Sequence, residues 1–560
     1  MNQSEQSGKK KLRVGLLVDS FRQPAWAYAM LERIHRSEYA EIVLVVLNES
    51  SSVQEDHPDG VHGDRKYWLF NLYCKIDRWL FQPARDAFAM RDTASLLSGV
   101  PVISVGPKQV KYKDIIEPRD IAEIRKHEVD VFVRLGFRIL SGEILSTPKF
   151  GVWSYHHGDS AVLRGGPAGF WEVFEKQSVT GTTLQLLTED QDKGVVLGKT
   201  FSSTDMLSVA RNRSNYYWNA LSLLPRKLRK LHELGGEIFW SMVTAENRTV
   251  KYSPALRRRP ENRDFFLLFV KKSAALMRFK LRKLFFLNQW ILMYDLDKGI
   301  SGPLTNFKKI IPPKDRLWAD PFVLYKSNQY FIFLEEMKFK EKGHISLIIM
   351  DEEGRHGLPV KVLEKPYHLS YPFILEWHGD YYMIPESTAN KTVDVYKCTR
   401  FPDKWEFHNT LLNNIRAADT TVVSYQDKWW LFANIQENEG ASNWEELFLF
   451  YADNPLSDNW APHPQNPIVS DVRRARPAGN VFLRNGKLYR PAQDCSKTYG
   501  YGMRINEIVT MNEYEYKEVE VRFIEPDWAD DIKGVHTLNV AHKLTVIDAI
   551  HKRPYYWFKR

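Results

Sequence analysis

The sequence predicts two domains of different fold class: a doubly wound, Rossmann-type α/β domain over residues 12–240 and an all-β, five-bladed propeller over residues 311–560. A chain of 560 residues is too long for one hydrophobic core, so two or more domains are expected. The first 240 residues alternate continuous Val/Ile/Leu runs with helical segments, which indicates a parallel sheet covered on both faces. Beyond residue 315 a two-stranded unit repeats about every 50 residues, which is typical of a propeller.

The composition is that of an ordinary globular protein, with 44% hydrophobic and 26% charged residues, and it argues against long disordered regions. A formal net charge of +9, from 78 basic and 69 acidic residues, permits an anionic partner without requiring one, and we expect no nucleic acid partner. Cys74, Cys398 and Cys495 include no CxxC pair, which argues against a disulfide framework or a zinc cluster. The apolar runs are too short for a signal peptide core or a membrane span, so we expect a cytoplasmic protein.

The N-terminal strands are predicted from short apolar runs, and the helices from apolar residues at helical spacing. We expect strands at 13–18, 41–47, 100–105, 129–136 and 151–155, helices near 26–34 and 118–129, and two more strands within 179–200. Active sites of such sheets lie at the carboxyl ends of the strands. The loop that follows residues 151–155 is therefore where we expect a site.

That loop belongs to the stretch GVWSYHHGDSAVLRGGPAGFWE, residues 151–172. Two histidines, an aspartate and an arginine occur within nine residues of it, and a histidine can act as an acid or a base near neutral pH. The glycines that follow let the backbone approach a ligand closely, and Pro167 suits the first turn of a helix. Asp192, which lies shortly before Gly194, is the expected partner from a neighbouring strand end.

The order of these residues resembles the folate-dependent formyltransferases, which include enzymes acting on methionyl-tRNA, glycinamide ribonucleotide and sugars. In that family a strand ending Asn-x-His precedes an Arg-Gly pair, a Thr-Gly strand and an Asp-x-Gly. The matching positions are Ser154, His156, Arg164-Gly165, Thr180-Gly181 and Asp192-Lys193-Gly194. The resemblance covers roughly residues 12–235 and implies formyl transfer from 10-formyltetrahydrofolate to an amine.

The resemblance also implies roles for single residues. In the family the histidine and the asparagine stabilise the oxyanion of a tetrahedral intermediate, and the aspartate orients the histidine and assists proton removal. His156, Asp192 and Ser154 are therefore the predicted catalytic residues. A strand and loop over 134–145 resemble the folate-contacting segment, and the predicted cofactor-binding residues are Leu135, Gly136, Phe137, Ile139, Leu140, Arg164 and Gly165.

Two departures from the family leave the activity open. Serine replaces asparagine at position 154, and loss of one oxyanion donor costs about 10²–10³ in rate. The polar segment 157–161 replaces the family's Pro-Ser-Leu-Leu-Pro loop, so the domain could serve a different acceptor or could have lost formyl transfer.

Two other interpretations of the loop remain open. His156, His157, Asp159 and Asp192 have side chains that suit zinc or iron, although adjacent histidines on an extended chain point to opposite faces. Alternatively, the histidines bond only to loop backbone and the glycines serve a turn. We expect no metal.

Residues 241–310 are predicted to be a basic, partly helical linker. The segment 256–290 mixes aromatic and basic residues, which admits peripheral contact with an acidic membrane surface. Because its pattern is not cleanly two-faced, a helix packed between domains with its basic side chains in solvent is favoured.

The repeat beyond residue 315 consists of two strands around a polar turn. Copies occur at 321–336, 372–387, 420–435 and 480–494, with a weaker fifth at 538–550. Five copies predict five blades, with the last residues closing the ring.

The propeller also carries candidate functional residues. WADPFV, residues 318–323, resembles the first-blade Asp-Pro signature of glycoside hydrolase family 43, and the repeat resembles the propeller domain found beside plant glucosamine inositolphosphorylceramide transferase. Glycosidases need two carboxylates, about 5–10 Å apart. The predicted saccharide site consists of Asp320, Glu386, Asp419, Arg476 and His536, with Gln493-Asp494 nearby.

Tyr371-Pro372 stands where a second Asp-Pro would be, which leaves open whether the propeller hydrolyses a glycan or only binds one. A further interpretation has Asp320 capping a turn, with the other polar groups bonded to backbone or water.

Together these features predict an enzyme of glycan assembly. The N-terminal domain would transfer a formyl group to an amino sugar, nucleotide-linked or lipid-linked, and the propeller would hold the saccharide. The alternative is a carbohydrate-active or carbohydrate-binding propeller beside an inactive formyltransferase-like domain.

Overall fold

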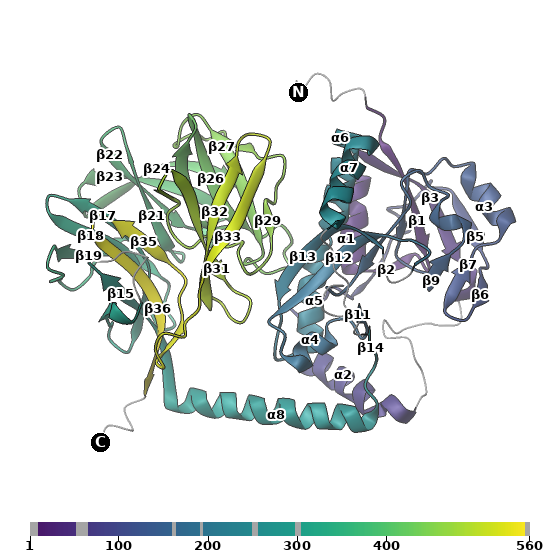
Figure 1. The fold of residues 1–560 in the computed structure, drawn as a ribbon, viewed down its shortest axis with the longest axis horizontal. Helices are drawn as coiled ribbons and strands as arrows, with labels where there is room; N and C mark the ends of the chain where they lie inside the picture. The colour runs from purple at the N-terminus through teal and green to yellow at the C-terminus, as the bar shows by residue number, and fades with distance from the viewer. Residues whose placement is uncertain are drawn as a thin grey trace. The chain divides into compact units, whose positions relative to one another are not determined.

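The structure is a computed structural model that describes residues 9–51, 65–159, 164–190, 194–248, 256–296 and 304–554. The chain divides into two compact units. Unit 1 comprises residues 1–272 and 438–441, and unit 2 comprises residues 273–437 and 442–560. Figure 1 shows the helices and strands of both units.

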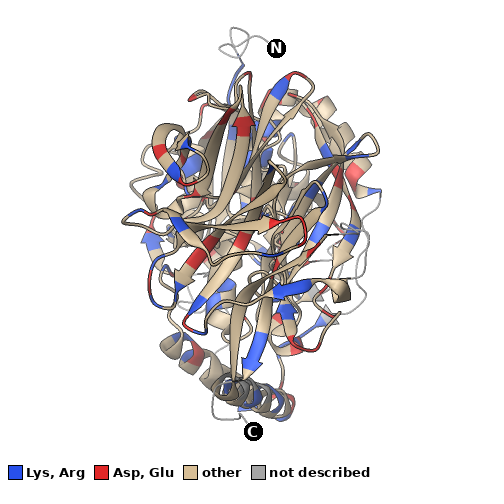
Figure 2. Cartoon of the chain, turned by 90° about the vertical axis from the view of Figure 1, so that its left-hand side faces the viewer, with Lys and Arg blue, Asp and Glu red and all other residues tan. Residues whose placement is uncertain are grey.

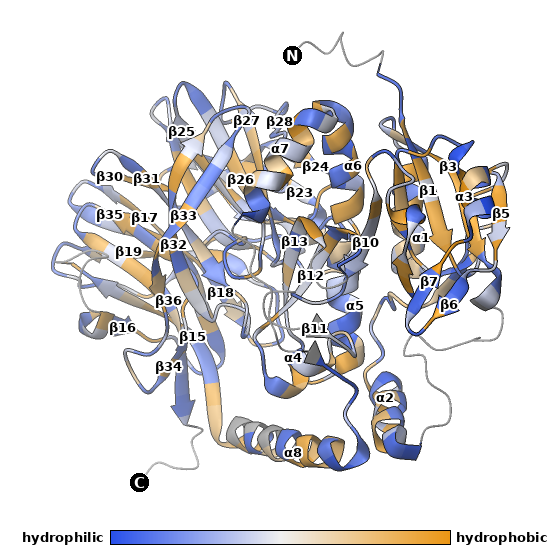
Figure 3. Ribbon diagram, turned by 45° about the vertical axis from the view of Figure 1, so that its right-hand side comes forward, coloured by the Kyte–Doolittle hydropathy of each residue, from blue (hydrophilic) through white to orange (hydrophobic). Residues whose placement is uncertain are grey.

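Unit 1 is built on a seven-stranded sheet within the described residues, in the order β13-β12-β10-β8-β1-β3-β5. Its strands are β1 (Leu12–Val18), β3 (Ala40–Asn48), β5 (Val102–Val105), β8 (Val131–Arg134), β10 (Val152–His156), β12 (Val179–Leu186) and β13 (Val195–Ser203). The first five are parallel, and β12 and β13 add an antiparallel edge. The hydrophobic colour of β1 and β3 in Figure 3 corresponds to the apolar runs that predict them.

The strand order reverses between β1 and β8. From β1 the chain adds β3 and β5 toward one edge of the sheet, and it then returns to add β8 and β10 on the opposite flank of β1. The carboxyl ends of β1 and β8 therefore meet at a topological switch point, which is where ligands bind in open α/β sheets.

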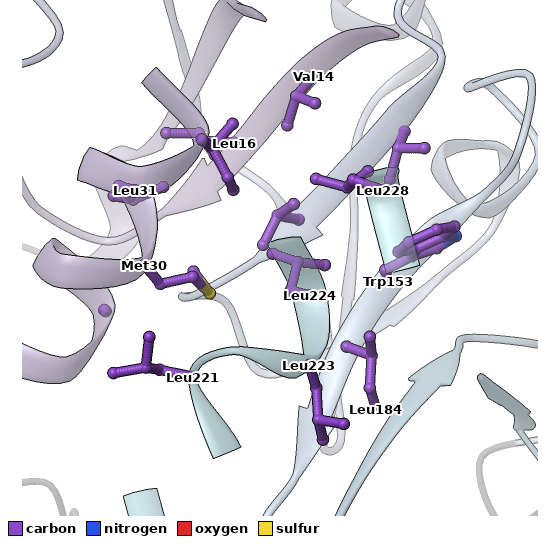
Figure 4. Close-up of a cluster of buried hydrophobic side chains, with 14 of the residues drawn as sticks. Val14, Leu16, Met30, Leu31, Trp153, Leu184, Leu221, Leu223, Leu224 and Leu228 are labelled. Carbon is purple, nitrogen blue, oxygen red and sulfur yellow. The ribbon is translucent and has the colours of Figure 1, made fainter. Parts of the chain in front are cut away.

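Helices cover both faces of this sheet. On one face α1 (Ala25–His35), α6 (Leu223–Leu234) and α7 (Gly236–Asn247) pack over a cluster of buried apolar side chains, part of which is drawn in Figure 4. The other face is covered by α3 (Pro118–Arg125), which buries Ile121 and Ile124. Helix α1 forms because Ala27, Met30, Leu31 and Ile34 are spaced to make one continuous apolar stripe.

Further strands and helices belong to unit 1. They are β2 (Arg22–Pro24), β4 (Met90–Asp92), β6 (Lys108–Val110), β7 (Lys113–Ile115), β9 (Ile139–Ser141), β11 (Arg164–Gly165), β14 (Leu256–Arg257), α2 (Trp68–Leu80), α4 (Phe170–Glu175), α5 (Val209–Ala220) and the start of α8 (Asn262–Phe285). Strand β9 pairs with β7 directly beyond the switch point.

Beyond the end of α8, unit 2 is an all-β structure, as predicted for residues 311–560, and its described residues form five antiparallel sheets. Four of them are β17–β20 (Arg316–Lys326, Gln329–Lys338, His344–Asp351, Val360–Leu363), β21–β24 (Ser370–Trp377, Asp380–Glu386, Thr392–Arg400, Lys404–Asn413), β25–β29 (Ala417–Tyr425, Lys428–Ile435, Glu446–Ala452, Ala461–Pro462, Val469–Ser470) and β30–β33 (Phe482–Arg484, Lys487–Asp494, Gly502–Met511, Tyr516–Ile524). The first four predicted hairpins are the first two strands of these four sheets, and the weaker fifth, at 538–550, is the pair β35 (Leu538–Ala541) and β36 (Leu544–Pro554) of the fifth sheet. Basic and acidic positions are interspersed along these strands (Figure 2).

The fifth sheet joins the two ends of unit 2. It contains β15 (Phe286–Asp295), β16 (Lys308–Ile310), β34 (Ile532–Gly534), β35 (Leu538–Ala541) and β36 (Leu544–Pro554). Strand β15 pairs with β36 along its whole length. The final strand thus closes the ring with the first one, which is how propellers avoid an open sheet edge.

This closure corrects the predicted linker of residues 241–310. Residues 241–247 belong to α7, and β15 and β16 belong to the closing sheet. The run Ile291–Tyr294 is buried in blade cores, so it is a blade strand. Its strand pattern was obscured in sequence by the aromatic and basic residues of α8 directly before it.

Candidate functional site

Two predicted catalytic residues lie on β10 at the carboxyl edge of the unit 1 sheet. His156 is the last residue of β10, and Ser154 is buried two positions earlier. The parallel register places Ser154 opposite Arg134, the last residue of β8. Strand ends on one side of the switch point therefore bring together Arg134, Ser154 and His156.

Arg134 orients the Ser154 hydroxyl. Its Nη1 donates to Ser154 Oγ at 3.2 Å, while its Nε and Nη2 donate to the carbonyl oxygens of Phe137 and Arg138 at 2.7–3.1 Å. A guanidinium carries only donors, so Ser154 must accept from it and keeps its own proton to donate. Among the described residues, the Ser154 hydroxyl has an acceptor in the Tyr155 carbonyl oxygen at 3.4 Å, which is a long contact. Ser154 is thus arranged as a donor at this edge.

The predicted cofactor loop lies at the switch point and is tied to the end of β1. The backbone nitrogen of Phe137 donates to Asp19 Oδ1 at 2.8 Å. A Cβ at Gly136 would lie 2.4 Å from the Asp19 backbone nitrogen, so only glycine fits. The side chains of Phe137 and Leu140 are buried in the core under α3, whereas Ile139 is 37% exposed. Contact with a ligand at the buried positions would therefore be through the backbone.

The other predicted members of this site are described in part. Leu135 is partly buried against the main apolar cluster. Gly165 pairs with Arg257 across the short β11–β14 ladder, and Arg164 is described only as backbone in the same ladder. Asp192 lies outside the described residues, so its predicted pairing with His156 stays a prediction.

The remaining polar residues of the loop have structural partners. The ring of His157 stacks on Tyr217 at 3.6 Å and contacts Trp26 at 5.4 Å. Its burial, with the neighbouring His156 and Arg213, lowers the pKa of His157 well below its ordinary value, so the ring is neutral. Asp159 pairs with Lys199 at 2.7 Å. These contacts account for two of the four side chains in the metal interpretation.

In unit 2, three inner strands carry a strained residue at the same place. Asp320, Tyr371 and Asp419 have φ of 50°, 45° and 52°, and the register with the next strand shifts at each of them. Such a conformation costs a non-glycine residue about 1–3 kcal/mol and concentrates at functional sites. Two of the predicted saccharide-site residues are thus held by bulges that turn them off the pleat.

Asp320 belongs to a buried network with the closing sheet. Its Oδ1 accepts from Thr537 Oγ1 at 2.8 Å and lies 3.7 Å from His536 Nε2. The other ring nitrogen of His536 lies 2.6 Å from Asp548 Oδ2. Asp320, His536 and Asp548 are close enough to hold a cation, but their contacts with one another already explain their arrangement.

A second network surrounds Arg476. Its Nε donates to Asp419 Oδ2 at 2.6 Å, and its Nη2 donates to Glu386 Oε2 at 3.2 Å. Gln493 Nε2 also donates to Asp419 Oδ2 at 2.6 Å. The five residues predicted for the saccharide site therefore fall into two buried networks, whereas Asp494 instead pairs with Arg504.

Aromatic side chains border both networks. Trp290 stacks on His536 with ring centroids 4.0 Å apart, and Tyr499 meets the same ring edge-on at 5.3 Å. The Arg476 guanidinium lies 4.9 Å from the Tyr499 ring centroid, and Trp444 adjoins Tyr499 at 5.7 Å. Trp290, Tyr499 and Trp444 are partly exposed. Sequence reasoning missed these aromatics because they come from β15 and from loops between strands.

Three buried carboxyl groups in this part of unit 2, those of Asp320, Asp419 and Glu335, have raised pKa values. Burial raises the pKa of Asp320 to about 6, with Asp419 and Asp548 adding to the rise and His536 opposing it. Burial also raises the pKa of Asp419 to about 7, against the lowering effect of Arg476. Glu335, missed from the sequence, has its pKa raised well above the ordinary range by burial and by nearby carboxylates. Groups that titrate near neutral pH can exchange protons with a ligand.

Comparison with known proteins finds sequence similarity to two different kinds of enzyme. Residues 311–551 match the protein family described as glucosamine inositolphosphorylceramide transferase 1, N-terminal. The transferase of that name from Oryza sativa subsp. japonica is 34% identical over 207 residues, which are 36% of this chain and 28% of the rice protein. The propeller is therefore homologous to part of these transferases, and the chain spans well under half of their length.

A methionyl-tRNA formyltransferase from Gloeothece citriformis is 27% identical over 154 residues, covering 27% of this chain and 44% of that enzyme. Among solved structures, a family 117 glycoside hydrolase from Zobellia galactanivorans covers 47% of this chain and 90% of its own, at 13% identity and a TM-score of 0.32. So low a TM-score does not identify a fold, and the propeller is instead established by its strand pairings.

Proposed function

We propose that the protein transfers a formyl group from 10-formyltetrahydrofolate to the amino group of a sugar, nucleotide-linked or lipid-linked, in glycan biosynthesis. The observation that carries the proposal is the switch point of unit 1. There the ends of β1, β8 and β10 bring the Gly136 loop beside Ser154 and His156. These residues follow one another along the sequence in the same order as the corresponding residues of formyltransferases. A propeller related to a transferase named for glucosamine supports an amino sugar, because glucosamine carries a primary amine.

The residues present fit the co-substrate in part. Gly136 brings the backbone close to the end of β1, and Ile139 presents an exposed apolar side chain. The carbonyl oxygen of Arg138 already accepts two hydrogen bonds from Arg134, whereas that of Phe137 accepts one and keeps a lone pair for a donor group of a pteridine.

The chemistry is an acyl transfer. The sugar amine attacks the formyl carbon, a tetrahedral oxyanion forms, and the amine loses a proton. The bond from carbon to N10 then breaks, and N10 takes up a proton to leave as tetrahydrofolate. In this proposal the Ser154 hydroxyl, which accepts from Arg134, and His156 donate to the oxyanion. Asp192 is the proposed base that takes the amine proton, directly or through His156.

Formyl transfer can be measured by mass spectrometry of amino sugars incubated with the protein and 10-formyltetrahydrofolate. We expect His156→Ala to abolish the mass gain and Ser154→Asn to keep or raise it. Lys149→Ala, on the loop before β10, is the matched control and should leave turnover unchanged. Turnover that survives His156→Ala would refute the proposal.

A second candidate is a carbohydrate-active or carbohydrate-binding propeller beside an inactive unit 1. The buried acids and the aromatic border of unit 2 favour it, because aromatic faces stack on sugars. In that case sugar binding or turnover would depend on Asp320 and Glu386, and His156→Ala would have no effect.

A further inference from the structure

Helix α2 presents an apolar stripe to solvent. Trp68, Leu72, Ile76 and Trp79 are 54%, 45%, 45% and 73% exposed. Their spacing of four, four and three residues puts them on one face of the helix. In a globular protein such a stripe normally faces the core, whereas here the core-facing residues of α2 are others, among them Phe70.

The first half of α8 lies against α2 and runs parallel to it. Near the helix starts the Leu69 backbone nitrogen donates to Asn262 Oδ1 at 3.1 Å. One turn on, the rings of Tyr73 and Phe265 are 5.4 Å apart, and Lys272 Nζ donates to the Tyr73 hydroxyl at 3.1 Å. Because the partners advance together along both helices, the two helices are parallel.

Helix α8 adds its own exposed apolar side chains. Phe266, Leu267, Phe269 and Val270 are 56%, 53%, 42% and 47% exposed. Large apolar side chains therefore project from both members of the pair, and Trp79 is the most exposed of them.

The two sets lie on the same side of the helix pair. An α-helix turns about 100° per residue, so Leu72 lies about 100° in one sense from Tyr73, which faces α8. Phe266 and Val270 lie roughly 100–140° in the other sense from Phe265, which faces α2. When two parallel helices touch along one line, residues reached by turning in opposite senses from that line, one sense on each helix, lie on the same side of the pair. That side is opposite to Phe70, whose ring packs on Phe170 in the body of unit 1.

The charge of the pair is positive. The part of α8 that lies against α2, residues 262–272, contains three basic residues, Arg263, Lys271 and Lys272, and one acidic residue, Asp264. On α2 the basic Lys75 and Arg78 are exposed, while the acidic Asp77 is buried and accepts from Ser208 Oγ at 3.0 Å. The outer surface of the pair thus combines apolar side chains, including tryptophans, with basic groups at its edges. Among the described residues, no helix is long and apolar enough to span a membrane.

We propose that this two-helix face docks on the surface of a bilayer that contains anionic phospholipid. Apolar side chains enter the boundary between headgroups and acyl chains, and the lysines and arginines meet lipid phosphates. A bilayer matches both features, since it accepts a row of separated apolar side chains without requiring a complementary shape. The proposal is independent of formyl transfer.

The test is co-sedimentation of the full chain with vesicles of phosphatidylcholine alone and of phosphatidylcholine mixed with phosphatidylserine. We expect binding to the mixed vesicles that weakens with added salt, and little binding to phosphatidylcholine alone. Each of Leu72→Ser and Trp79→Ser should lower the partition coefficient about tenfold, because each removes a large apolar side chain from the bilayer. The double variant Lys75→Glu, Arg78→Glu should remove the preference for phosphatidylserine.

The matched control is Tyr514→Ser, which changes an aromatic side chain that is 71% exposed on unit 2. It should bind vesicles like the wild type. Because the substituted side chains are exposed, unchanged circular dichroism is expected for every variant. Absence of wild-type binding to mixed vesicles, or equal binding by wild type and Trp79→Ser, would overturn the proposal. So would self-association through this face that excludes vesicles.

Discussion

Removing the Arg476 guanidinium should destabilise unit 2 in a pH-dependent way. Arg476 is 6% exposed and lies between Asp419 and Glu386, whose side chains are 2% and 11% exposed. The substitution Arg476→Met keeps much of the side-chain volume and leaves both carboxylates without their cation. Breaking a buried ion pair from one side costs about 3–5 kcal/mol. For a domain of this size that corresponds to a fall in Tm of roughly 6–20 °C.

The dependence on pH follows from the direction of the pKa shift. Burial already raises the pKa of Asp419 to about 7 in the presence of Arg476, which lowers it. A carboxyl with a raised pKa binds more protons in the folded state, so stability falls as pH rises from about 4 through the folded-state pKa. Without Arg476 that pKa rises further. The loss caused by Arg476→Met should therefore be larger at pH 8 than at pH 5.

The assay is thermal unfolding followed by circular dichroism at both pH values. The matched control is Arg473→Met, in the same loop, because Arg473 pairs with Asp471 while 38% exposed. A pair at that exposure is worth about 0–1 kcal/mol, so the control should lose little at either pH. Equal losses for Arg476→Met and the control, or a loss at pH 5 that matches the loss at pH 8, would refute the reasoning.

Two further predictions concern tightly packed groups. Gly136→Ala should lower the free energy of unfolding by about 1–3 kcal/mol, because the new Cβ would meet the Asp19 backbone. Gly106→Ala, where a Cβ has open space, is the control and should cost much less. Equal midpoints of urea unfolding for the two variants would contradict this prediction. Replacement of Glu335 and of Glu336 by glutamine should change the free energy of unfolding at pH 7 by very different amounts. Burial keeps Glu335 neutral, so its change should be nearly silent, while Glu336 accepts from Arg316 and Ser346 and should lose about 1–3 kcal/mol. Burial raises the pKa of Glu336, but its partners, among them His344, Ser346 and Arg316, outweigh burial and hold the pKa at about 2. The contribution of Glu336 should therefore disappear only as pH falls from about 4 toward 2.

The parallel strands were predictable because their signal is local. β1 and β3 are continuous apolar runs of strand length, and the hairpins of unit 2 repeat with polar turns such as Asn485-Gly486. Strand β15 was not predictable in the same way, because its partner β36 is more than 240 residues away and no local pattern records that pairing.

The candidate sites, like the strands, were predictable only where the sequence signal is local. His156 and Asp320 could be found because they belong to short motifs. The bond from Arg134 to Ser154 depends on the register between two parallel strands, and the aromatic border depends on loops from different blades. Leu140 matched a motif position, yet its side chain is in the core, because spacing alone does not say which face of a strand is buried.

Formyl transfer by unit 1 requires that a reduced folate binds at its switch point. Calorimetric titration of the full chain with 5-formyltetrahydrofolate, a stable analogue of the co-substrate, measures this binding. We expect saturable binding at one site per chain that Gly136→Ala weakens strongly and Arg473→Met leaves unchanged. Absence of binding at millimolar ligand, or binding that Gly136→Ala does not alter, would contradict it.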